Sequence, residues 1–196
     1  RATRLHLSRA WPARYSALTG MGLLAGRRRR THTVTPDLEG LLALPTAALA
    51  LRSATGLRPT GVGAVCVKPS AAGPFEGLPS HAQSMDSFGY TWLTCSRSPD
   101  NPGGLIADLH AINAALVAQG DGSGLLCTLL AFTDGHGPAV GLIYLPKRGT
   151  WYPFAPTGNE KRDNQRELWI KEQLGGDLKV DQDLSRWSPL WGAPGL

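Results

Sequence analysis

The stretch that decides the fold is "LLCTLLAFTDGHGPAVGLIYLPKRGTWYPFAP", residues 125–156. It holds three apolar runs, which are separated by the short segments "TDGHGP" and "PKRG". Apolar runs of this length between turn residues predict β-strands, and such short connections predict that neighbouring strands are antiparallel. We therefore expect a three-stranded antiparallel meander in this part of the chain.

The segments on either side of the meander predict two further strands and three helices. Upstream we expect a helix within 35–59 that breaks at Pro45, a strand over 61–68, a loop of about twenty residues, a strand over 87–96 and a helix that ends at Gly120. Downstream, a charged helix begins near Thr157 and ends at Gly175. The order α-β-β-α-β-β-β-α clusters the strands, which predicts an α+β domain with an antiparallel sheet of about five strands and flanking helices.

The positive charge of the chain is concentrated at its start. The formal net charge is +5, but residues 1–30 carry eight arginines and no acid, so the rest holds 12 bases and 15 acids, a net of −3. We expect a basic leader over 1–34, disordered or non-native, and one domain over 35–196 with an aromatic tail over 184–196. Residues 1–20 show no clear periodicity, so Met21 is the expected true start, which would lower the net charge to +1.

The leader contains the segment "MGLLAGRRRR", residues 21–30, which we interpret as a possible membrane contact. Leu23 and Leu24 can insert among lipids while Arg27, Arg28, Arg29 and Arg30 meet anionic headgroups, at roughly 1 kcal/mol per basic residue. Two alternatives stay open for the same arginines, a solvated tail and weak nucleic-acid binding. An export signal is disfavoured, because Pro36, Asp37 and Glu39 interrupt the approach to the following apolar run.

Motifs for catalysis, metals and cofactors are weak. Cys66, Cys95 and Cys127 each lie in an apolar run without C-x-x-C spacing, which predicts buried thiols in a reducing compartment and no structural zinc. No serine-hydrolase elbow, P-loop or dinucleotide fingerprint is present, so we expect no catalytic residues, no metal and no cofactor. The alternative is an enzyme of unknown reaction with a site near Cys95, Asp108 and His110, although the i, i+2 spacing points the last two to different helix faces.

The richest candidate for a binding surface combines basic and aromatic residues. Basic residues follow the second strand of the meander and aromatics begin the third, while two tryptophans lie in the tail. Because exposed aromatics beside basic residues anchor protein partners well, we hypothesise that this set contacts a partner: Lys147, Arg148, Trp151, Tyr152, Trp187 and Trp191. The alternatives are that the aromatics belong to the core, or that they stack on single-stranded nucleic acid, which the acidic domain disfavours.

Three segments carry a resemblance to a known family: "GLRPTGVG" (56–63), "KRGTWYPFAPTG" (147–158) and "LSRWSPLWGAPGL" (184–196). With these the chain resembles the PspA-associated PspAB-like family, whose members begin with M-G-L-L and a basic cluster. The resemblance implies a role in the bacterial phage-shock and envelope-stress response, with PspA or an HtpX-type membrane protease as partner, and it supplies no catalytic residues. We thus expect a non-enzymatic protein-binding adaptor, cytoplasmic or peripheral at the inner face of the membrane. The order of elements also resembles the folds of type III secretion chaperones and YbjN-like proteins.

Overall fold

A six-stranded antiparallel sheet with the order β2-β3-β1-β4-β5-β6 organises the computed structural model, which describes residues 34–68, 75, 77–79 and 81–196. The described residues from Val34 to Leu196 belong to one compact unit. The strands of the sheet are β1 (Arg58–Val67), β2 (Ala82–Met85), β3 (Thr91–Ser96), β4 (Leu125–Thr133), β5 (Val140–Leu145) and β6 (Thr150–Phe154). The expected meander is therefore confirmed as β4-β5-β6, and the α+β class is confirmed with it.

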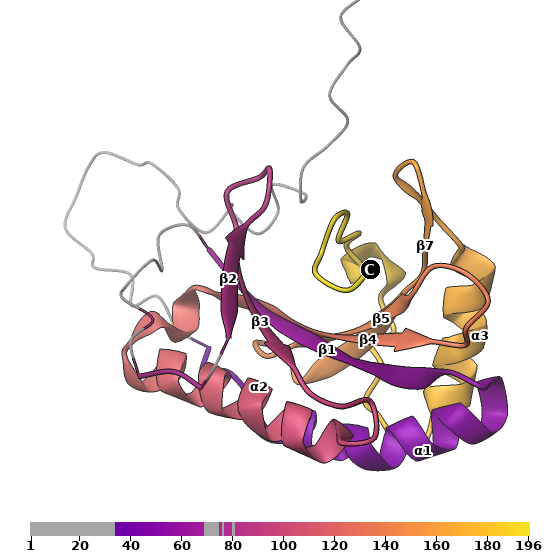
Figure 1. The fold of residues 1–196 in the computed structure, drawn as a ribbon, viewed down its shortest axis with the longest axis horizontal. Helices are drawn as coiled ribbons and strands as arrows, with labels where there is room; N and C mark the ends of the chain where they lie inside the picture. The colour runs from indigo at the N-terminus through magenta and orange to yellow at the C-terminus, as the bar shows by residue number, and fades with distance from the viewer. Residues whose placement is uncertain (1–33, 69–74, 76, 80) are drawn as a thin grey trace, which may run out of the picture. The chain divides into compact units, whose positions relative to one another are not determined.

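Helices lie across one face of this sheet, and the C-terminal segment lies over the other (Figure 1). The first layer holds α1 (Leu44–Thr55) and α2 (Pro102–Ala118), and α2 contacts β1, β3 and β4. The third helix, α3 (Asn164–Leu174), packs against α1 and β6. Because both faces are covered, β5 and β6 are buried along their whole length, which explains why their residues are almost all apolar.

Side-chain caps set where two of the helices begin. Asn101 accepts a hydrogen bond from the backbone N–H of Gly104 at 2.9 Å, and Pro102 follows it as the first residue of α2. Asp163 caps α3 in the same way, accepting from the N–H of Arg166 at 2.9 Å. The predicted break at Pro45 is present, since a 3₁₀ helix over Glu39–Ala43 precedes α1.

The expected number of strands was wrong, because the sheet has six strands and a separate two-stranded hairpin is present. The additional strand β2 lies within the long loop that we expected after β1, and its sequence "AQSM" is short, polar and fully exposed. It pairs only with β3 at the edge of the sheet, so it needs no apolar face. The small hairpin pairs β7 (Pro156–Gly158) with β8 (Lys161–Arg162).

All of the predicted leader except Val34 lies outside the described residues, and so do its proposed membrane contacts, Leu23, Leu24 and Arg27 to Arg30. In the described part of the chain, no helix combines the length and the apolar character needed to cross a bilayer.

Candidate functional site

The turn between β5 and β6 places Lys147 and Arg148 at the tip of a hairpin, as expected. The carbonyl of Leu145 accepts hydrogen bonds from the backbone N–H groups of Arg148 at 3.0 Å and Gly149 at 2.9 Å. Gly149 has a φ of +61°, and a Cβ on it would collide with the side chain of Asp37, so the turn requires glycine here. The tight turn leaves Arg148 exposed and Lys147 half-buried.

Lys147 is restrained although its ammonium group lies near the surface. Its Nζ donates to the carbonyl of Ser123 at 2.7 Å. Burial lowers the pKa of Lys147, and the positive charge of Lys68 lowers it further. Lys147 therefore contributes to the edge of the site an ammonium group whose position is fixed by its hydrogen bond to Ser123.

Three of the four aromatic residues predicted to contact a partner are core residues, which corrects that part of the hypothesis. Trp151, Tyr152 and Trp187 are 1%, 0% and 5% exposed, and Trp191 is half-buried. Trp187 stacks on Tyr152 with ring centroids 6.0 Å apart, and Trp191 packs against Phe154 at 5.0 Å. The tail thus covers the sheet face that the helices leave open, where burying these rings is more favourable than exposing them.

A segment after α3 brings acidic side chains to the hairpin tip. The backbone of Trp151 donates to the carbonyl of Lys179 at 2.9 Å and accepts from the N–H of Asp181 at 2.8 Å, so Val180 runs parallel to β6 as an isolated bridge. The carbonyl of Asp181 also accepts from the indole Nε1 of Trp187 at 3.0 Å. Asp181 is therefore fixed between the edge of the sheet and the tail.

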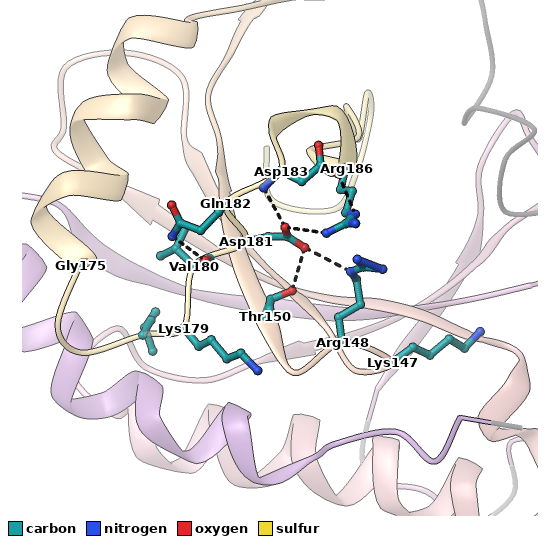
Figure 2. A pocket seen from close by; sticks show the side chains of 11 residues that line it. Lys147, Arg148, Thr150, Gly175, Lys179, Val180, Asp181, Gln182, Asp183 and Arg186 are labelled. Carbon is teal, nitrogen blue, oxygen red and sulfur yellow. Dashed lines mark hydrogen bonds and ion pairs between the residues drawn. The ribbon is translucent and has the colours of Figure 1, made fainter. Parts of the chain in front are cut away.

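Asp181 binds two arginines from different segments with its two carboxylate oxygens (Figure 2). Its Oδ2 accepts from Nε of Arg148 and from Oγ1 of Thr150, both at 3.2 Å. Its Oδ1 accepts from the backbone N–H of Asp183 at 3.0 Å and from Nη1 of Arg186 at 3.3 Å. Since Asp181 is only 4% exposed, this buried carboxylate sets the positions of both guanidinium groups.

The surroundings of Asp181 keep it ionised. Burial by itself raises the pKa of its carboxyl group, but the hydrogen bonds from Asp183 and Thr150 and the charges of Arg148 and Arg186 outweigh it, and the pKa is lowered overall. A carboxylate with a lowered pKa is charged at neutral pH and is a poor proton donor. Asp181 is thus suited to holding cations and not to acid catalysis.

An open pocket of about 700 Å³ lies at this cluster, between the hairpin tip and the segment that follows α3. Leu178 and Val180 contribute apolar side chains to its wall. Its charged lining residues are four bases and two acids, a net of +2, namely Lys147, Arg148, Lys179, Arg186, Asp181 and Asp183. A cationic pocket on a domain whose sequence is slightly acidic attracts negatively charged groups.

The alternative catalytic site around Cys95 does not gain support from its geometry. Cys95 is buried, and its burial, followed by the charge of Asp108, raises the pKa of the thiol to about 11. Asp108 is engaged by Arg97, whose Nε and Nη2 donate to its two oxygens at 2.6 Å and 3.0 Å. The thiol is protonated at neutral pH and the carboxylate is occupied, an arrangement that disfavours a cysteine nucleophile.

The described residues offer no arrangement typical of a metal centre. Among them, no three His, Cys, Asp or Glu side chains are placed to hold a metal ion together. His110 has a buried Nε2 without a hydrogen-bond partner in the described part of the chain.

Sequence reasoning found the basic tip but missed Asp181, Arg186 and Lys179. A local signal existed, because "VDQDLSR" (180–186) places two aspartates and an arginine just after the glycines that end α3. The sequence did not indicate that this segment returns to the side of β6.

Comparison with families of known proteins matches residues 21–195 to the family of PspA associated protein B. Comparison with curated proteins and with solved structures finds no match. The matched range begins at Met21 and includes the meander, the Asp181 pocket and the aromatic tail. The chain belongs to the PspA associated protein B family.

Proposed function

We propose that this protein is a non-enzymatic adaptor of the phage-shock and envelope-stress response, and that it binds PspA through the surface around the Asp181 pocket. The description of the family supports PspA as the partner. The observation that carries the choice of surface is the cluster in which Asp181 holds Arg148 and Arg186 at the rim of an open pocket. Charged groups held in fixed positions favour specific association, because less side-chain entropy is lost when the partner arrives.

The revised surface keeps Lys147 and Arg148 and replaces the aromatic residues with charged ones. Lys179 and Arg186 join the two basic residues of the hairpin tip around the same pocket. Trp151, Tyr152 and Trp187 then have a supporting role, because they anchor the segment that carries Asp181. The adaptor acts in the cytoplasm or at the inner face of the membrane, and an HtpX-type membrane protease is the alternative partner.

Co-purification of the full chain with PspA tests this function. We expect the two proteins to elute as one complex in size-exclusion chromatography, and we expect the HtpX-type protease to form no complex in the absence of PspA. Failure of the folded protein to form a complex with purified PspA would contradict the proposal.

The competing enzyme hypothesis is tested with two substitutions, Cys95→Ala and His110→Ala. For an adaptor, each variant that remains folded should support the envelope-stress response at the wild-type level. Loss of the response with unchanged thermal stability would favour catalysis instead.

A further inference from the structure

We infer that the Asp181 pocket recognises carboxylate side chains of an acidic segment on its protein partner. This inference rests on the proposed function and adds the chemistry of the contact. It begins from the number of hydrogen-bond donors that the two arginines leave unused.

Each guanidinium carries five N–H donors, and the Asp181 cluster engages only some of them. Arg148 donates to Asp181 through Nε, and its two Nη groups have no partner among the described residues. Arg186 uses Nη1 for Asp181, and its Nε lies 3.1 Å from Oδ2 of Asp183, which leaves Nη2 without a partner in the same part of the chain. Terminal guanidinium nitrogens are the donors that bind a carboxylate in a bidentate manner.

The two lysines of the pocket widen the positive surface on either side. Lys179 is exposed, and its ammonium group forms no hydrogen bond or ion pair with a described residue, whereas Lys147 donates to the carbonyl of Ser123. Four of the 12 basic residues that follow residue 30 line this one pocket. Because that part of the chain is net acidic, the pocket is a local positive region that steers negative groups toward it.

The form of the pocket favours a protein segment over a compact phosphate group. The pocket is open and its wall includes the aliphatic side chains of Leu178 and Val180, which fit the methylene groups of a glutamate or an adjacent apolar residue. Two of its positive charges are already balanced by Asp181 and Asp183, which suits singly charged carboxylates spread along a surface. A phosphate concentrates about two negative charges at one point, so the two carboxylates of the pocket repel it more strongly than they repel a single carboxylate.

Lys179→Glu tests the inference without disturbing the cluster, because Lys179 contributes only its backbone to the described contacts. Lys161→Glu is the matched control, since Lys161 is also exposed and lies in β8, outside the residues that line the pocket. Binding of PspA to the full chain is measured by calorimetry at about 0.05 M and about 0.5 M salt, where the screening lengths differ roughly threefold. Thermal unfolding of each variant verifies that the fold is intact.

We expect Lys179→Glu to weaken PspA binding by about tenfold at low salt, and Lys161→Glu to leave it nearly unchanged. High salt should weaken wild-type binding and reduce the difference between the variants. If PspA binds wild type and Lys179→Glu equally well, the inference is overturned while the proposed function stands.

If PspA does not bind at all, the proposed function fails, and the pocket is tested by itself with a synthetic peptide of alternating glutamate and leucine. Binding of this peptide, but not of its glutamine counterpart, with a loss in Lys179→Glu, would still support carboxylate recognition. Equal binding of both peptides or of neither, or stronger binding of inorganic phosphate or of vesicles with phosphatidylglycerol, would overturn it.

Discussion

Removing the Asp181 carboxylate should destabilise the fold by an amount that follows from its contacts. Asp181 accepts from Arg148, Arg186, Thr150 and the N–H of Asp183. The side chains of the two arginines are 35% and 42% exposed, so water can replace that part of the interaction. Of the two remaining bonds, the one from Thr150 is buried and the one from the N–H of Asp183 is partly buried, and each joins a charged acceptor, at about 1.5–3 kcal/mol.

Asp181→Ala should therefore lower the free energy of unfolding by about 3–5 kcal/mol, and Asp181→Asn, which keeps one acceptor oxygen, by about 1–3 kcal/mol. For a domain of this size, about 1 kcal/mol shifts the midpoint of thermal unfolding by about 2–4 °C, so the alanine variant should unfold roughly 10 °C below wild type. Thermal unfolding followed by circular dichroism measures this shift. Asp177→Asn is the matched control, because Asp177 is exposed and its carboxylate has no partner among the described residues.

The difference in stability between wild type and the Asp181 variants should also depend on pH, and the lowered pKa of Asp181 sets the direction of this dependence. The pKa of Asp181 is lowered in the folded protein, so its ionised form stabilises the fold. This contribution is fully present above the pKa of the unfolded chain, about 3.9, and is lost as the pH falls through the lower folded value. The difference in stability between wild type and Asp181→Asn should be constant near neutral pH and shrink below about pH 4. Equal unfolding midpoints for wild type and both variants at pH 7, or a difference that grows in acid, would refute the reasoning.

Three further predictions concern the tail, the irregular part of β1 near Gly61 and the cysteine Cys95. Trp187→Ala should cost about 3–5 kcal/mol of stability in urea unfolding because the ring is buried against Tyr152. Tyr152→Phe, which removes the hydroxyl that donates to the carbonyl of Ser188, should cost about 1 kcal/mol. Gly61→Ala should destabilise by about 1–3 kcal/mol in the same assay, because Gly61 has a φ of +84° and a Cβ would collide with the carbonyl of Arg97; wild-type stability would contradict this strain. Native Cys95 should resist iodoacetamide at pH 8 and react after unfolding, as followed by mass spectrometry, because its pKa is raised to about 11; rapid native labelling would support the enzyme hypothesis.

The fold could be predicted from the sequence where periodicity and turn residues agree. The meander was predictable because Gly and Pro separate runs that are buried on both faces, and α2 was predictable because Leu105, Leu109, Ile112 and Leu116 recur along one side. The edge strand β2 could not be predicted in this way, because an exposed strand needs no apolar residues. The proposed likeness to type III secretion chaperones and YbjN-like proteins depends on the order of elements alone.

The candidate site was only half predictable, for reasons of distance along the chain. Lys147 and Arg148 follow from the turn in which they lie, but Asp181, the partner of Arg148, is 33 residues away along the chain. The sequence left open whether the aromatic residues contact a partner or belong to the core, because a Trp-rich tail looks the same in sequence whether it is exposed or docked. The ring contacts of Trp187 and Trp191 with Tyr152 and Phe154 decide that question in favour of docking.

Zero-length cross-linking with a carbodiimide tests the central claim most directly, because the reagent joins a lysine amine only to a carboxylate in contact with it. The claim is that acidic side chains of PspA bind in the Asp181 pocket. We predict that cross-links to PspA map to Lys179 and Lys147 and disappear at high salt. Cross-links that map to Lys161 or Lys171, with the two pocket lysines unmodified, would contradict the account.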